Sequence, residues 1–90
     1  MRPADPDTVV RDVGRRVAEL RAHVDLTQEQ LAAKAEVSVK YMQRVERGEE
    51  NLGIRSLVRL ANLLHASVTD LFQQPMTRRR RTGRPPKRSE

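Results

Sequence analysis

The first part of the chain carries apolar side chains at steps of three and four residues. They are Val10, Val13, Val17, Leu20 and Val24. This spacing is typical of a helix that buries one stripe of its surface and leaves the rest in water. Asp7 or Thr8 is the predicted N-cap, because a short polar side chain there accepts a hydrogen bond from the first helical N–H groups.

Two shorter helices are expected next. The first begins at Thr27, since the letters TQEQ place a hydroxyl at the cap and a glutamine three residues later, the pattern of a capping box. Its inward positions are Leu31, Ala32 and Ala35. The second runs from Ser38, with Met42 and Val45 inward, and stops at Gly48, because glycine is the residue that most often ends a helix.

A fourth helix is predicted from about Ile54 to Leu64, and a short fifth one after the cap-like residues 67–70. The fourth has Leu57, Leu60, Ala61 and Leu64 inward, and the fifth carries Val68, Leu71 and Phe72. No segment alternates with a period of two, so the sequence predicts no strand. The expected domain is all-α, with five helices over residues 8 to 73.

Charge divides the chain into a balanced body and a cationic tail. Residues 1 to 74 hold 11 basic and 11 acidic side chains, whereas residues 75 to 90 hold seven basic side chains and one acidic. The basic ones are Arg78, Arg79, Arg80, Arg81, Arg84, Lys87 and Arg88. A tail of this composition cannot form a core, so we expect it to be disordered and to seek a polyanionic partner.

Several classes of function are excluded or disfavoured. Without cysteine there are no disulfides, thiolate metal sites or cysteine nucleophiles. His23 and His65, the two histidines, stand far apart, so no metal and no cofactor are predicted. No nucleophile is paired with a base, and no glycine-rich loop precedes a helix, so an enzyme is not expected. Without a signal peptide or a long apolar run, we expect a soluble cytoplasmic protein with no membrane partner and no small-molecule substrate.

The third predicted helix has a polar side suited to DNA. Lys40, Arg44 and Arg47 lie four and three residues apart and so share one side, while Met42 and Val45 point the other way. A major groove about 12 Å wide admits one such helix. A solvated basic face without a partner is the alternative interpretation.

Three motifs in a fixed order connect these elements. They are LTQEQLA, VSxxYMxRVERG and LxRLAxLL followed by VTDLF. Over residues 13 to 72 the chain resembles the Cro/C1-type (Xre-like) helix-turn-helix family. The resemblance implies a five-helix lambda-repressor-like domain that binds double-stranded DNA, with its helix-turn-helix over about residues 27–47.

The resemblance also implies roles for single residues. Val39, Lys40 and Arg44 fall where the family meets base edges; Ser38 and Gln43 flank them, and Gln28 and Arg47 fall where it touches phosphate. Lys40 and Arg44 would favour guanine, and Val39 a thymine methyl. Tyr41 either covers the DNA backbone or packs against the protein.

Other positions are implied to be structural. Arg21 and Glu46 fall where related domains form a partly buried ion pair, the alternative being two surface charges. Glu36 and His65 stand where the family commonly has glycine, so a local cost or a different turn is expected.

The tail has a weaker resemblance to an AT-hook. TGRPPKR after RRRR contains the Gly-Arg-Pro core of that motif, with Thr82 in place of its first arginine. Arg84 would then lie in an A·T-rich minor groove, with Arg81, Lys87 and Arg88 on phosphates. An unspecific basic arm is the alternative.

The leading interpretation is a sequence-specific transcriptional regulator that binds as a homodimer, because one short helix reads too few base pairs to select a genomic site. Leu71 and Phe72 are the candidate dimer contacts, the alternative being that both close the core. An antitoxin or protein-interaction adaptor with secondary DNA binding is the alternative, and it would have a protein partner. A DNA-packaging protein is a third possibility, which the neutral body disfavours.

Overall fold

The computed structural model describes residues 3–76, and four α-helices and one 3-10 helix lie wholly within them. In chain order these are α1 (Pro6–His23), α2 (Gln28–Ala35), α3 (Val39–Glu46), α4 (Ile54–Leu63) and η1 (Val68–Phe72). Residues 3–76 contain no strand, and the all-α prediction is confirmed. The tail was predicted to begin at Pro75, which is wrong at that residue, because the Pro75 side chain is fully buried. The other predictions for the basic tail fall on residues 77–90, outside the described part.

The first helix begins earlier than predicted. Its N-cap is Asp5 rather than Asp7 or Thr8: the Thr8 N–H and the Thr8 hydroxyl both donate to Asp5 Oδ2, at 3.3 and 2.9 Å. Pro6 is the first helical residue. Proline costs nothing there, because its missing N–H would have no partner within the helix.

The fifth predicted helix is a 3-10 helix and not an α-helix, so the count of α-helices is four. Ser67 N–H donates to Asp70 Oδ2 at 2.9 Å, and Asp70 N–H donates to Ser67 Oγ at 3.3 Å. Gln73 is already extended and Pro75 follows, so the chain has room only for one tight turn. The backbone and side-chain hydrogen bonds of Ser67, aided by the positive charge of Arg16, lower the pKa of Asp70.

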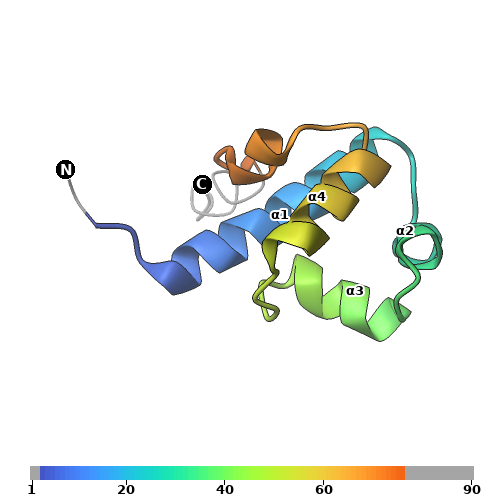
Figure 1. Ribbon diagram of the computed structural model, residues 1–90, viewed down its shortest axis with the longest axis horizontal. Helices are drawn as coiled ribbons and strands as arrows, with labels where there is room; N and C mark the ends of the chain where they lie inside the picture. The colour runs from blue at the N-terminus through green and yellow to red at the C-terminus, as the bar shows by residue number, and fades with distance from the viewer. Residues whose placement is uncertain (1–2, 77–90) are drawn as a thin grey trace, which may run out of the picture.

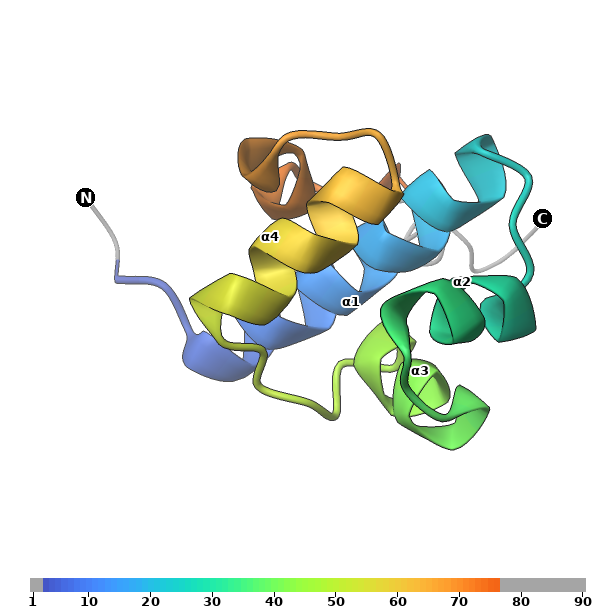
Figure 2. The same cartoon turned by 45° about the vertical axis from the view of Figure 1, so that its right-hand side comes forward.

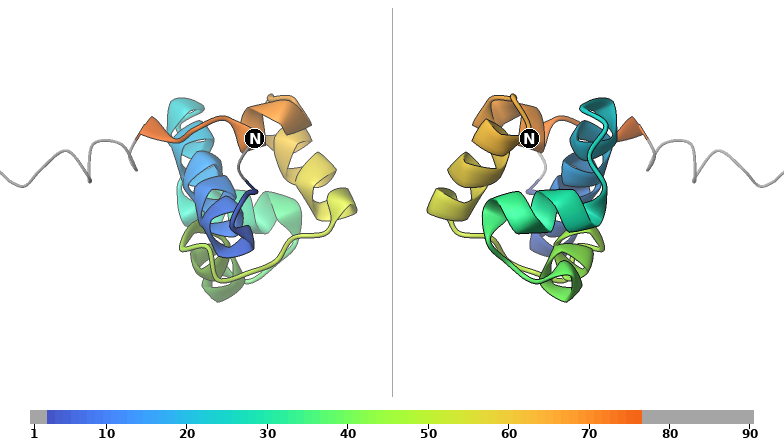
Figure 3. Two further views of the ribbon diagram at one scale, coloured as in Figure 1. Left: turned by 90° about the vertical axis from the view of Figure 1, so that its left-hand side faces the viewer. Right: turned by 90° about the vertical axis from the view of Figure 1, so that its right-hand side faces the viewer.

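The core lies between α1 and α4 and receives side chains from all five elements. α1 contacts α3 and η1, while α4 contacts α2 and η1. Seen end-on, α1 and α4 stand on opposite sides of the molecule, and α3 lies at the edge away from η1 (Figures 1 and 3). The buried apolar residues are Val13, Val17, Leu31, Ala32, Ala35, Met42, Val45, Leu57, Leu60, Ala61, Leu64 and Leu71.

Turned by 45°, the molecule shows α2 and α3 together along one edge, with α3 outermost (Figure 2). The short α2–α3 unit is therefore carried at the surface by the longer helices. Within residues 3–76 no helix is long and apolar enough to cross a membrane.

Two positions where related domains commonly have glycine do take the left-handed conformation that glycine tolerates. Glu36 ends α2 with φ 61° and ψ 42°, and His65 follows α4 with φ 57°. Both turns therefore keep the left-handed backbone conformation that usually requires glycine, although neither residue is glycine. A residue with a Cβ pays roughly 1 kcal/mol or more for this conformation.

Candidate nucleic-acid interface

α2 and α3 form the predicted two-helix unit, and both begin with capped ends. At the start of α2, Gln30 N–H donates to the Thr27 hydroxyl at 3.0 Å, while Thr27 N–H donates to the Gln30 side-chain oxygen at 2.8 Å. This is the capping box that TQEQ predicted. At the start of α3, Tyr41 N–H donates to Ser38 Oγ at 3.0 Å. These bonds fix where each helix begins.

The rotation of α3 about its axis is fixed by the burial of two side chains. Met42 and Val45 are each 1% exposed and lie in the core. Lys40 and Arg47 are exposed, and the Arg44 side chain is 40% exposed. The other predicted contact residues of this segment are exposed or half-buried: Ser38, Val39 and Gln43. The predicted basic side of α3 therefore faces outward.

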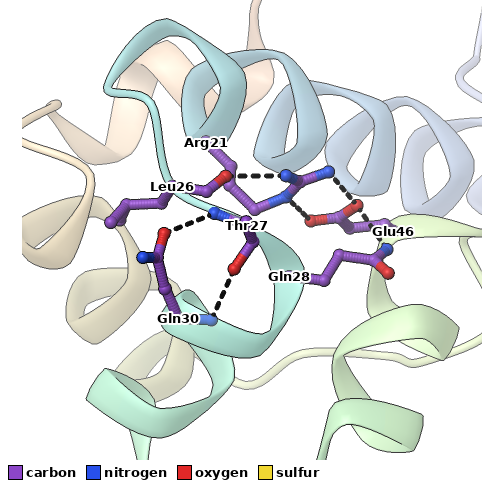
Figure 4. A network of polar contacts seen from close by, with 6 residues as sticks. All are labelled: Arg21, Leu26, Thr27, Gln28, Gln30 and Glu46. Carbon is purple, nitrogen blue, oxygen red and sulfur yellow. Dashed lines mark hydrogen bonds and ion pairs between the residues drawn. The ribbon is translucent and has the colours of Figure 1, made fainter.

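Behind α3, a polar network joins three parts of the fold (Figure 4). Arg21 of α1 donates from Nε to Glu46 Oε2 at 2.6 Å and from Nη2 to Glu46 Oε1 at 3.1 Å. Its Nη1 donates to the carbonyl oxygen of Leu26 at 2.8 Å. The side chains are 19% exposed for Arg21 and 7% for Glu46. The pair is bidentate and partly buried, which is the geometry in which an ion pair holds two elements in place.

Gln28 belongs to the same network. Its Nε2 donates to Glu46 Oε1 at 2.8 Å, so the first residue of α2 is tied to the end of α3. An amide nitrogen carries two hydrogens, and this bond uses one of them. Sequence reasoning missed this contact, because a separation of 18 residues leaves no local pattern.

The outward arginines have acidic partners that the sequence did not predict. Arg44 Nε donates to Glu50 Oε2 at 2.8 Å, and the Arg44 guanidinium lies 5.7 Å from the centroid of the Tyr41 ring. Arg47 donates to Glu49 from Nε at 3.3 Å and from Nη2 at 3.4 Å. The glutamates follow the end of α3, so the periodicity of a helix could not have matched them with their arginines.

The two candidate dimer contacts have different environments. Leu71 has no exposed surface and closes the core, so its prediction as a surface contact is wrong. Phe72 is 54% exposed and borders a mainly apolar pocket of about 100 Å³, which is lined by α1, the end of α3, loop residues 50–52, α4 and η1. The sequence could not separate them, because a turn of 3-10 helix sends neighbouring side chains to different sides.

Comparison with known proteins identifies the family. A family described as helix-turn-helix domain matches residues 12–72. An uncharacterized HTH-type transcriptional regulator of Archaeoglobus fulgidus is 35% identical over 57 residues, which is 63% of this chain and 81% of that protein.

Solved structures agree. The restriction-modification controller protein C.AhdI from Aeromonas hydrophila is 33% identical with a TM-score of 0.66, over 70% of this chain and 96% of that one. The clp gene regulator ClgR from C. glutamicum is 28% identical with a TM-score of 0.69, over 71% and 82%. The chain therefore belongs to the helix-turn-helix family of DNA-binding domains.

Proposed function

We propose that this protein is a transcriptional regulator that binds double-stranded DNA sequence-specifically and reads the major groove with α3. The observation that supports this proposal is how α3 packs on the domain. Met42 and Val45 bury one side of the helix in the core, and Lys40 and Arg44 lie on the outward side. A rigidly seated helix with polar side chains outward is what groove reading requires. The proposal is for a binding protein and not for an enzyme.

We assign the proposed base and phosphate contacts from the exposure of each side chain and its position on α2 or α3. Val39, Lys40 and Arg44 read base edges, with Ser38 and Gln43 beside them. Arg47 binds phosphate, as does Gln28, whose second amide hydrogen is available beyond its bond to Glu46. In this arrangement Glu46 is structural: it holds Arg21 and Gln28 and so fixes α3 relative to the start of α2.

Homodimerisation and assistance by the tail are parts of the proposal. Half-exposed Phe72 and the apolar pocket beside it support a contact with a second copy. Two copies would face half-sites about 34–36 Å apart. The seven basic residues after residue 77 supply the charge for phosphate or minor-groove contacts that the balanced body lacks. The proposed place of action is the nucleoid in the cytoplasm.

The test is selection of bound sequences from random duplexes by the full chain at roughly 150 mM salt, where unspecific binding is weak. We expect a motif with two-fold symmetry. Lys40→Ala should lose the preference at one base pair in each half-site. The matched control is Lys34→Ala, which removes the same charge from an exposed position of α2 and should keep the motif.

Three results would count against parts of the proposal. Enrichment of no motif would refute sequence-specific reading. A motif that Lys40→Ala and Lys34→Ala change alike would refute the assignment to α3. An asymmetric single half-site, together with a monomer in sedimentation, would refute the homodimer and favour an adaptor whose apolar pocket serves another protein.

A further inference from the structure

Arg44 forms its ion pair with Glu50 through a single nitrogen of its guanidinium. The bond to Glu50 uses Nε, and within residues 3–76 no hydrogen bond uses Arg44 Nη1 or Nη2. The remaining outer edge, formed by the two terminal nitrogens, is the pair of parallel donors that matches guanine O6 and N7. The ion pair therefore leaves the base-reading edge of this arginine available.

Arg47 shows the opposite arrangement and serves as an internal comparison. Glu49 takes both its Nε and its Nη2, at 3.3 and 3.4 Å, so one of its terminal nitrogens is already engaged. This pair is also more exposed, with side chains 59% and 51% accessible against 40% and 27% for Arg44 and Glu50. The Arg44 pair is shorter and better shielded from water, and so holds its geometry more firmly.

Two further features restrict Arg44. Its guanidinium lies over the Tyr41 ring, 5.7 Å from the centroid, an arrangement that attracts a cation to the ring face. Glu50 in turn is brought back alongside α3 by the way that helix ends. Gly48 has φ 75°, its N–H donates to the Val45 carbonyl at 3.0 Å, and Glu49 N–H donates to the Arg44 carbonyl at 2.9 Å.

These bonds form a Schellman motif, which reverses the chain within two residues. A side chain at position 48 would place Cβ 2.6 Å from the Cα of Arg11. The turn therefore requires glycine both for its positive φ and for the lack of space for a Cβ. Glu50 thus occupies its place through the backbone of the helix end and not through a flexible surface encounter.

We propose that Glu50 is a specificity-determining positioning residue: it fixes Arg44 with its two terminal nitrogens toward DNA, so that Arg44 demands guanine at one base pair of each half-site. The inference rests on the proposed function. A long arginine that is already ordered loses less conformational entropy on binding and tolerates fewer alternative partners. In the proposed complex the Glu50 carboxylate would lie near phosphates, and like-charge repulsion would then lower affinity for unspecific DNA.

The experiment uses the full chain and the duplex selected by the wild-type protein, with single base-pair changes at each position. Arg44→Ala identifies the position that Arg44 reads. Glu50→Ala should reduce the preference for guanine at that same position by about tenfold, and raise affinity for random duplex by about two- to fivefold. Glu50→Gln keeps an oxygen that can accept from Arg44 Nε, so it should retain most of the preference.

Glu49→Ala is the matched control. It removes the same charge from the neighbouring residue, so it should raise unspecific affinity to a similar extent while leaving the base preference intact. Equal losses of preference in Glu49→Ala and Glu50→Ala, or an undiminished preference in Glu50→Ala, would overturn the positioning role. A wild-type protein that selects no motif would instead overturn the proposed function, and this inference with it.

Discussion

Gly14→Ala tests how closely α1 approaches α3, and therefore what sets the position of α3, the proposed reading helix. In an exposed helix this exchange stabilises by about 1 kcal/mol. Here a Cβ at position 14 would lie 2.3 Å from the carbonyl oxygen of Val45, 3.0 Å from the Gly48 nitrogen and 3.1 Å from the Glu46 carbonyl oxygen. All three are backbone atoms, so no side chain can turn away to make room.

The magnitude follows from the space required. An ordinary contact needs about 1 Å more than the structure leaves, so the end of α3 must shift away from α1. Overpacking of this kind costs about 1–3 kcal/mol or more, against the gain of about 1 kcal/mol in helix propensity. Because all three contacts are with backbone atoms, the cost lies at the upper end, about 3 kcal/mol. We therefore expect a net loss of roughly 2 kcal/mol in the free energy of unfolding, and a fall of about 8–16 °C in the melting temperature.

The assay is urea and thermal unfolding followed by the helical circular dichroism signal. Ala18→Gly, at a half-buried position of the same helix, measures what the exchange is worth in α1 without the contact, and should cost about 1 kcal/mol. A Gly14→Ala protein that is more stable than the wild type would refute the close approach of α1 and α3. Such a result would also remove the argument that this contact sets the position of α3.

Three further predictions concern the turns and the polar network. His65→Gly should raise the free energy of unfolding by about 0.5–1 kcal/mol, because it removes the strain of φ 57°; chemical denaturation measures it, and a loss of stability would contradict the reasoning. Glu46→Ala should cost about 3–5 kcal/mol, because it leaves the partly buried Arg21 guanidinium without its carboxylate; a loss below about 1 kcal/mol would reduce the pair to a surface contact. Asp70 should titrate in the folded protein below its ordinary pKa of 3.8, and Ser67→Ala should raise that pKa, as NMR titration can measure. The ionised Asp70 carboxylate stabilises the fold at pH values above its unfolded pKa, and acid unfolding should show this stabilisation disappear as the pH falls through its folded pKa.

The helices were predictable from the sequence because their evidence is local. Apolar spacing of three and four residues located α1 and α4, and the TQEQ letters placed the start of α2 at the residue where the structure has it. The N-cap of α1 was placed too late, because three polar residues near Pro6 all have the right chemistry and only the backbone geometry selects Asp5. The last short helix was predicted in the right place but not its 3-10 type, since cap residues mark the start of a helix without fixing its hydrogen-bonding pattern.

Contacts between distant residues were harder to predict. Nothing local connects Arg21 with Glu46, 25 residues away; the resemblance to a family suggested that pair, and the structure brings its atoms to 2.6 Å. Burial distinguished Leu71 from Phe72 only once α1 and α4 were in place. The Arg44–Glu50 pair was not predicted from the sequence. It depends on the reversal of the chain after α3, and the sequence indicates that reversal only by Gly48.

The ion pairs of the arginines at the end of α3 explain how residues 1–74 can carry a basic stripe and still have no net charge. Arg44 and Arg47, which look like a basic stripe in the sequence, are each matched by a glutamate within 3.4 Å. Of the three basic side chains on that side, Lys40 alone has no ion pair within residues 3–76. Under the proposed function, this face would attract DNA weakly at long range and act mainly on contact, where a guanidinium can exchange or share its carboxylate. The same proposal leaves long-range attraction to the seven basic residues of the tail. Removing the tail should then weaken binding to all sequences alike, while the base preference proposed for α3 persists.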